Sequence, residues 1–263
     1  MVVELTMLQM TNHPFLRISW ITQSDGSPDP VPNPEIVSAY IEALDDSGER
    51  AGSSVYAVVK GGSTTEAIHQ RLHERRTKAV VGADIYTAKP NCIVVTEMGS
   101  LDEATALESE LSNRVGKLER AFGTAAPQTI AHGIYREVST VIGQEADLVP
   151  ASGFGPVVQV GTFNMPSGED ELAVQEWYRT RRLPSFAAIK GGIRARRLIG
   201  VCGAPAKLGI LYEFTSLQER IEHFEPLEAV DHDEHRPSAA ARTQHPPFSP
   251  GVGILLPTRR GSR

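Results

Sequence analysis

Hydrophobic residues along the chain occur in two patterns: short runs rich in β-branched residues, and longer segments in which apolar residues have the spacing of an α-helix. The runs at 15–21, 55–59, 92–98, 157–163 and 207–214 are rich in valine, isoleucine and aromatic residues, which is typical of strands. Apolar residues three and four positions apart predict amphipathic helices over 35–45, 64–80, 102–122, 169–182 and 217–230. The alternation of the two patterns predicts an α+β protein.

The same pattern occurs twice along the chain. Around Glu97 and around Glu213, a short apolar strand carries a glutamate and is followed by Ser-Leu and a helix. The two glutamates are 213 − 97 = 116 residues apart. The branched runs at 55–59 and 157–163 each precede a further helix, so each copy follows the order β-α-β-β-α-β. A repeat of this length predicts one duplicated structural unit.

The repeat divides the chain into an arm and two ferredoxin-like units. We place the first unit at 51–145 and the second at 156–263. Residues 1–50 fall outside this alignment and predict an N-terminal arm with a strand at 13–22, a proline-rich loop and a short helix. In the alternative, this segment supplies the first strand and helix of the first unit.

Charge and composition exclude several classes of protein. A net charge of −6 and a pI near 5.8 give no electrostatic reason to expect nucleic acid or an anionic membrane surface as a partner. No apolar run approaches the roughly 20 residues that span a bilayer, and the N-terminus lacks the pattern of a signal peptide. Two cysteines make no disulfide framework, so the sequence predicts a cytoplasmic protein.

Two segments of the second unit carry a family resemblance. Residues 176–184 (Glu-Trp-Tyr-Arg-Thr-Arg-Arg-Leu-Pro) and 191–197 (Gly-Gly-Ile-Arg-Ala-Arg-Arg) resemble the first-helix signature of the dimeric α+β barrel superfamily, in particular its EthD-type branch. The tail at 242–253 resembles the closing segment of tandem members. The chain departs from the pattern at Arg182, where the family usually has histidine, and at Lys190-Gly191, where it usually has Pro-Gly.

The resemblance implies that two antiparallel sheets close into a barrel within one chain. Each unit would form a four-stranded sheet with its helices on one face, which leaves the other face apolar. Closing these faces on each other removes them from water, and each Å² of apolar surface buried stabilises the fold by roughly 25 cal/mol. The cavity between the sheets is then the expected ligand site. A monomer or a homodimer is consistent with both sheets lying in one polypeptide.

The second unit supplies most of the candidate site residues. They are Tyr178 and Arg182 as catalytic residues, and Asn164, Arg196, Tyr212 and His223 as substrate-binding residues. Tyrosine and arginine suit a phenolic or carbonyl oxygen because an oriented donor stabilises charge that develops on it. The structural alternative, which we favour for the two tyrosines and Arg196, places the tyrosines in the core and Arg196 in solvent.

In the first unit, His73 and His132 are candidates for general acid-base catalysis, and Tyr86 is a substrate-binding candidate. His69 and His73 share a helical face, but the glutamate that follows the first histidine in zinc hydrolases is missing, so we expect no metal site. A phosphate-binding glycine loop, a Gly-x-Ser-x-Gly turn and a metal-binding cysteine pair are also missing from the sequence.

These observations leave three hypotheses about function. The first is an enzyme that needs no cofactor and acts on a small apolar carbonyl or phenolic compound as a lyase, isomerase or cyclase. The second is an oxygenase of the same fold, either cofactor-free or assisted by a heme that would need an axial histidine facing a large cavity. The third is a noncatalytic ligand-binding or stress protein, which the replacement at Arg182 favours.

Overall fold

Eight strands close into one antiparallel barrel. The computed structural model describes residues 14–23, 32–45, 52–79, 90–123, 126–149, 153–233 and 236–257. The strands are β1 (Phe15–Thr22), β2 (Ser53–Val59), β3 (Cys92–Met98), β4 (Gln128–Ile142), β5 (Val157–Phe163), β6 (Gly192–Cys202), β7 (Leu208–Phe214) and β8 (Gly251–Leu255). They are hydrogen-bonded in the order β1-β3-β2-β8-β5-β7-β6-β4, and β4 pairs with β1 to close the circle.

The barrel consists of two equivalent half-sheets. The first has the order β4-β1-β3-β2 and the second has the order β8-β5-β7-β6, so β1 corresponds to β5 and β3 to β7. The seams between them are β2 with β8 and β4 with β6. This arrangement confirms the prediction of tandem ferredoxin-like units whose sheets close within one chain.

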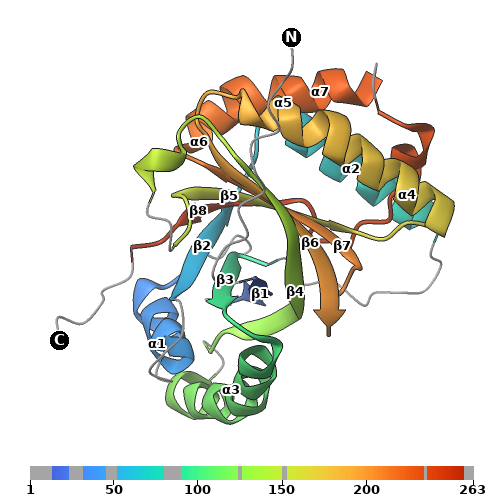
Figure 1. Ribbon diagram of the computed structural model, residues 1–263. Coiled ribbons are helices and arrows are strands. Elements are labelled where there is room, and N and C mark those ends of the chain that lie inside the picture. The colour runs from blue at the N-terminus through green and yellow to red at the C-terminus, as the bar shows by residue number, and fades with distance from the viewer. Residues whose placement is uncertain are drawn as a thin grey trace.

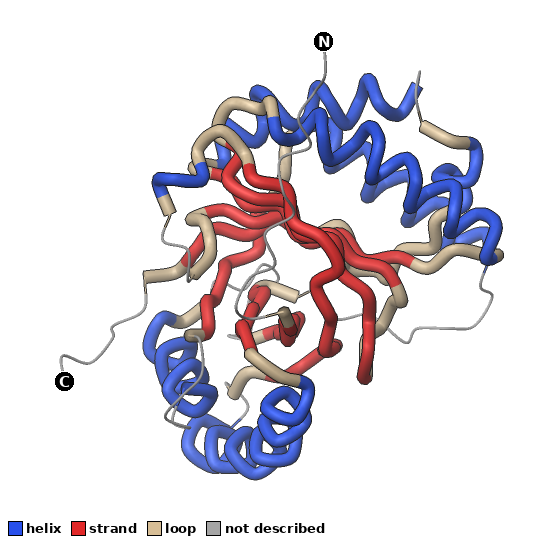
Figure 2. The backbone as a smooth tube through the Cα atoms, in the orientation of Figure 1, coloured by secondary structure: helices blue, strands red, loops and turns tan. Residues whose placement is uncertain are grey.

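Helices cover the outside of the barrel on two opposite sides. Figure 1 shows α1 (Pro34–Asp45) and α3 (Leu101–Phe122) against the first half-sheet. On the other side lie α2 (Ser63–Ala79), α4 (Gly168–Trp177) and α7 (Glu225–Asp233). Figure 2 shows the strands as a central layer between the two groups of helices. In the described residues, no helix is long and apolar enough to cross a membrane.

The N-terminal segment differs from the predicted arm. Strand β1 pairs with both β3 and β4, and α1 packs on the same half-sheet, so both belong to the first unit. The alternative alignment is therefore the one that the topology matches. Our alignment used β2 and α2 as the first strand and helix, because a branched run followed by a helix looks the same in both places. In the structure, α2 is an additional helix between β2 and β3.

Most predicted elements agree with the structure. Helix α3 begins after Ser100, whose side chain accepts a hydrogen bond from the Glu103 amide at 3.0 Å. The equivalent cap in the second unit is Ser216, which accepts from Glu219 at 3.1 Å and begins α6 (Leu217–Glu219). Tyr86, a candidate substrate-binding residue, lies outside the described residues.

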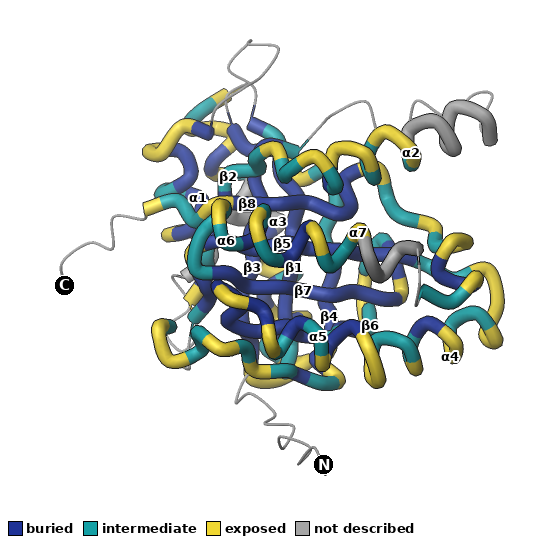
Figure 3. Tube along the Cα trace, turned by 90° about the horizontal axis from the view of Figure 1, so that it is seen from above, coloured by how far each residue is buried: buried dark blue, intermediate teal, exposed yellow. Residues whose placement is uncertain are grey.

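The barrel interior is a packed core, which corrects the predicted cavity between the sheets. Alternate residues of every strand point inward, and Figure 3 shows the strands as the most buried part of the chain. Large side chains fill this space, among them Trp20, Tyr56, Tyr135, Val158 and Leu211. Barrels of eight strands enclose just enough room for such side chains. The ligand site must therefore lie elsewhere.

Buried charges occupy one end of the same interior. Arg196 of β6 is fully buried and donates hydrogen bonds to Glu97 at 2.7 Å and to Glu213 at 3.1 Å. Glu137 lies 3.7 Å away, and the guanidinium stacks over the ring of Phe154 at 4.9 Å. Arg196 is thus neither a solvated residue nor part of a ligand pocket, because its strand turns it inward between the two repeated glutamates.

Replacing Arg196 with methionine should lower the free energy of unfolding by about 3–5 kcal/mol, since it leaves Glu97 buried without its cation and leaves Glu213 with Arg194 alone. Adding Glu97→Gln to Arg196→Met should recover part of that loss, because one buried charge is then removed. Urea unfolding followed by circular dichroism measures both values. Arg179→Gln, on an exposed helix face, is the control and should change stability by less than about 0.5 kcal/mol. A loss below about 1 kcal/mol for Arg196→Met would contradict the structural role of this network.

Candidate functional site

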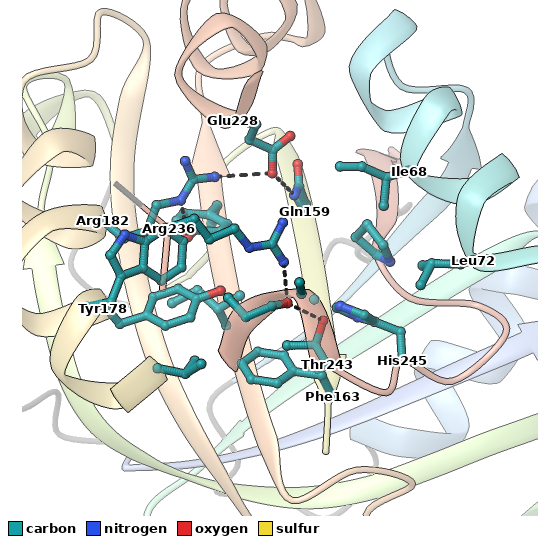
Figure 4. A pocket seen from close by; sticks show the side chains of 18 of the residues that line it. Ile68, Leu72, Gln159, Phe163, Tyr178, Arg182, Glu228, Arg236, Thr243 and His245 are labelled. Carbon is teal, nitrogen blue, oxygen red and sulfur yellow. Dashed lines mark hydrogen bonds and ion pairs between the residues drawn. The ribbon is translucent and has the colours of Figure 1, made fainter. Parts of the chain in front are cut away.

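A pocket of about 130 Å³ lies outside the barrel, between the second half-sheet and its helices. Its floor is the outer face of β5 and β7, and its walls come from α2, α4, α7 and the segment 236–250 (Figure 4). The residues that line it are Ile68, Arg71, Leu72, Gln159, Gly161, Phe163, Val174, Trp177, Tyr178, Arg182, Ile210, Tyr212, Glu228, Arg236, Ala240, Ala241, Thr243, His245 and Pro250.

Two π-helical turns shape the helices beside this pocket. The first, η3 (Tyr178–Arg182), continues α4 and leads into α5 (Leu183–Ala187), and the second, η4 (Arg220–Phe224), leads into α7. Each turn is followed by one residue and then a proline, Pro184 or Pro226. Because proline has no amide to donate, the regular hydrogen-bond ladder breaks there and the helix widens by one residue. The first turn presents both Tyr178 and Arg182 to the pocket.

Arg182 is the central polar residue of the pocket. Its side chain is 5% exposed, and it donates hydrogen bonds to the Tyr212 hydroxyl at 3.2 Å and to Glu228 at 3.2 Å. The guanidinium also stacks over the ring of Phe224, at 4.7 Å from its centre. These three contacts come from β7, α7 and η4, and they fix the arginine in one orientation.

A buried polar network supports Glu228 from behind. The Gln159 side chain donates to Glu228 at 3.0 Å and accepts a hydrogen bond from Arg220 at 2.9 Å. Arg220 is fully buried and also donates to Glu225 at 3.1 Å and to the Thr65 hydroxyl at 2.6 Å. The orientation of Glu228 therefore depends on side chains from β5, η4 and α2.

Helix α2 reaches this side of the barrel by a close contact with α7. Glu225 accepts hydrogen bonds from the amides of Thr64 and Thr65 at 3.3 Å each, so its carboxylate caps the N-terminus of α2. A Cβ atom at Gly62 would lie 2.0 Å from the Glu225 carboxylate, so only glycine allows the two to approach. His69 further along α2 hydrogen-bonds the Pro250 carbonyl at 2.6 Å. This docking places Ile68 and Leu72 over the pocket.

Positive charge exceeds negative charge in the pocket lining. The lining includes three arginines, Arg71, Arg182 and Arg236, and one carboxylate, Glu228. The Arg236 guanidinium projects into the middle of the pocket, where it donates to the Ala240 carbonyl at 2.8 Å (Figure 4). Burial lowers the pKa of Arg236, and the nearby charges of Arg182 and Arg71 lower it further. The site is therefore suited to a negatively charged ligand.

The two tyrosines of the pocket are neutral hydroxyl groups at ordinary pH. Burial raises the pKa of Tyr178, and the charge of Arg182 only partly offsets that effect. Burial likewise raises the pKa of Tyr212. The Tyr178 ring stacks on Phe163 at 6.1 Å between centres, next to His245 at 5.5 Å from the same phenylalanine. The pocket thus combines aromatic walls with hydroxyl and guanidinium donors.

Comparison with known proteins identifies the fold. No family model and no curated protein sequence matches the chain. Among solved structures, a provisionally titled chlorite dismutase has a TM-score of 0.53 at 8% identity and covers 92% of this chain and 94% of its own. A chlorite dismutase variant from Candidatus Nitrospira defluvii, with tryptophan replaced by valine, has a TM-score of 0.51 at 11% identity and covers 92% and 91%.

The protein has the dimeric α+β barrel fold. At identities of 8% and 11%, the resemblance is one of fold. The EthD-type branch is not among these structures. The first functional hypothesis, a cofactor-independent lyase, isomerase or cyclase with its site between the two sheets, is wrong: that space is filled with side chains, and the solved structures of this fold are titled chlorite dismutases.

Heme, which the oxygenase hypothesis allows as a cofactor, does not fit the described pocket. Pockets for drug-sized ligands measure roughly 300–1,000 Å³, and a porphyrin is larger than most such ligands, whereas this pocket measures about 130 Å³. His245 is the histidine among the residues that line it. Its Nδ1 atom lies 3.3 Å from the Ser249 hydroxyl, and its ring contacts Phe163. The pocket is of a size for a small organic molecule.

Some of the predicted site residues line the pocket and others lie elsewhere in the structure. Tyr178, Arg182 and Tyr212 lie together in the pocket. Asn164, at the end of β5, accepts a hydrogen bond from the Lys207 amide at 2.8 Å and does not line the pocket. His223 lies 3.1 Å from Glu219 at the surface.

The three candidates from the first unit lie outside the pocket or outside the described part of the chain. On the far side of the barrel, the Nε2 atom of His132 on β4 lies 3.0 Å from the Glu108 carboxylate of α3. His73 belongs to α2, but its side chain is outside the described residues, as is all of Tyr86. Their proposed roles stay predictions.

Sequence reasoning missed much of the pocket because its residues are distant in sequence. Gln159, Glu228 and Arg236 come from a strand, a helix and the segment after it. One available signal was the spacing of Pro184 and Pro226 behind two arginine-bearing helices, since each proline marks a widened turn. His245 was not among the candidate site residues, yet it lines the pocket.

The ionised carboxylate of Glu108, which contacts His132 and Arg17, should stabilise the fold at neutral pH but not in acid. Burial alone would raise the pKa of Glu108, but hydrogen bonds and charges from His132 and Arg17 lower it to about 2 from an ordinary 4.5. A lowered carboxyl pKa contributes stability above the unfolded value and loses it as the pH falls towards the folded value. Glu108→Gln should therefore be less stable than the wild type at pH 6, and the gap should narrow between about pH 4.5 and 2.

Thermal unfolding at a series of pH values measures this gap. The exposed Glu119 of the same helix supplies the control, and Glu119→Gln should show a small gap that does not change over this range. If the Glu108→Gln gap were equally independent of pH, the ionised pair would not be the source of the stability.

Proposed function

We propose that the protein is an oxygenase whose substrate is a small phenolic or enolic compound bound in the pocket of the second unit. One observation supports this most directly: Arg182 is held by Tyr212 and Glu228 in an apolar, aromatic pocket. A fixed guanidinium in a place shielded from water stabilises an oxyanion far better than solvent does. Small aromatic compounds with an acidic hydroxyl are substrates that would use such a group.

The chemistry needs a base as well as a cation. Glu228 lines the pocket, and its Oε2 atom accepts no hydrogen bond from the described residues, while its Oε1 atom is held by Arg182 and Gln159. We assign to Glu228 the removal of the hydroxyl proton from the substrate. Arg182 then stabilises the resulting oxyanion, and Tyr178 donates a hydrogen bond as a neutral phenol.

The oxidant is molecular oxygen, and the substrate anion supplies the electrons. Both atoms of O₂ enter the product, so the reaction balances without an outside reductant. The hydrophobic side chains of Phe163, Val174 and Ile210 surround the bound molecule and limit access of water. The EthD-type assignment, an apolar substrate and a monomeric or homodimeric state stay predictions within this proposal.

Replacing Arg182 with glutamine should lower kcat/KM for oxygen uptake by about 100-fold, because one oriented donor to the oxyanion is lost. An oxygen electrode measures uptake with 2-hydroxybenzoate, 2,5-dihydroxybenzoate, catechol and 1-naphthol as probes, and mass spectrometry with ¹⁸O₂ measures incorporation into the product. Arg179→Gln, one turn away on the exposed face, is the matched control and should retain wild-type activity.

Two results would contradict the oxygenase. The first is a wild-type protein that takes up no oxygen with any of these probes, and the second is a product whose added oxygen comes from water. Binding of the same probes without turnover would instead favour the noncatalytic ligand-binding hypothesis.

A further inference from the structure

Arg236 is the charged residue of the pocket with the weakest compensation among the described residues. Its guanidinium bonds one neutral acceptor, the Ala240 carbonyl, and its Nε atom is buried without a hydrogen-bond partner in the described part of the chain. The one carboxylate in the pocket lining, Glu228, is bonded to Arg182 and Gln159, with Arg220 at 3.8 Å. A partly buried cation without an ion-pair partner is costly, so among the described residues the charge of Arg236 is only partly balanced.

The surroundings of Arg236 indicate the charge and shape of a ligand that would pair with it. The guanidinium presents parallel N–H donors, a geometry that matches both oxygens of a carboxylate. Thr243 lies close to it and donates to the same Ala240 carbonyl at 3.0 Å (Figure 4). The same pocket is lined by Phe163 and Ile210, whose side chains are apolar. An inorganic anion would leave this apolar floor uncovered.

We infer that the pocket binds a small organic carboxylate, with Arg236 pairing with the carboxylate group while the apolar body packs on Phe163 and Ile210. The inference rests on the proposed function, because it assigns a substrate class to the same pocket. It places the carboxylate of the ligand at Arg236 and leaves Arg182 and Glu228 for the reacting hydroxyl. An acid that also carries a phenolic or enolic hydroxyl would use both groups.

Calorimetric titration of the full-length protein with matched acids and amides tests the charge requirement. The probes are benzoate, phenylacetate and 2-naphthoate, each with its amide as a neutral analogue of nearly the same shape. We expect at least one acid to bind about 10-fold more tightly than its amide, which corresponds to about 1.4 kcal/mol. Equal affinity for every acid and its amide, or no binding of any acid, would overturn the inference.

Substitutions of Arg236 test whether this residue binds the carboxylate group of the ligand. Arg236→Gln should weaken binding of the acid about 10-fold and leave binding of the amide unchanged. Arg236→Lys keeps the charge without the paired donors, so its affinity for the acid should lie between those of the glutamine variant and the wild type. Arg179→Gln is the control and should bind as the wild type does. Unchanged acid binding by both Arg236 variants would overturn the assignment, and if Arg236→Gln does not fold, the lysine variant still decides.

Phosphate distinguishes an organic from an inorganic anion site. In competition titrations, we expect phosphate at the concentration of the acid to leave acid binding unchanged. Complete displacement by equimolar phosphate would show a site for inorganic anions and overturn the inference. Measurement of oxygen uptake distinguishes a failure of this inference from a failure of the proposed function. Selective binding of acids without oxygen uptake would contradict only the proposal of an oxygenase. Oxygen uptake with no preference for acids would contradict only the inference of a carboxylate ligand.

Discussion

The contact between Arg196 and the two repeated glutamates is the interaction on which the architecture depends. Glu97 and Glu213 occupy equivalent positions on β3 and β7, and they meet the same guanidinium inside the barrel. Removing this guanidinium would leave Glu97 buried and unpaired, at a cost of several kcal/mol, whereas Arg194 would still pair with Glu213. The closed barrel in turn fixes the outer face of β5 and β7, which is the floor of the pocket.

The duplicated units differ on their outer faces. Leu16 pairs with Glu97 as Val158 pairs with Glu213, so Arg17 of β1 corresponds to Gln159 of β5. In the first unit, Arg17 forms an ion pair with Glu108 of α3, and this pair occupies the space beneath the helix. In the second unit, the shorter Gln159 supports Glu228, and the space in front of it is the pocket. Duplication thus supplied two similar faces, of which one is closed by an internal ion pair.

The sequence predicted the duplicated architecture but not the location of the ligand site. The match between the segments around Glu97 and Glu213 was sufficient because each includes a complete strand and a capped helix. The inward direction of Arg196 was not predictable, because in Arg194-Ala195-Arg196-Arg197 both faces of the strand carry arginine, and the partner Glu97 lies 99 residues away. The family resemblance led us to expect the cavity inside the barrel, where large aromatic residues in fact fill the space.

Neither unit forms the pocket without the other. Helix α2 lies in the sequence between β2 and β3 of the first unit, yet it covers the pocket of the second. Its N-terminus is held by Glu225, and Glu225 is held in turn by Arg220, the residue that also orients Gln159. A shift of α2 would therefore change both the wall of the pocket and the network behind Glu228. One polar network therefore joins the helix to the site.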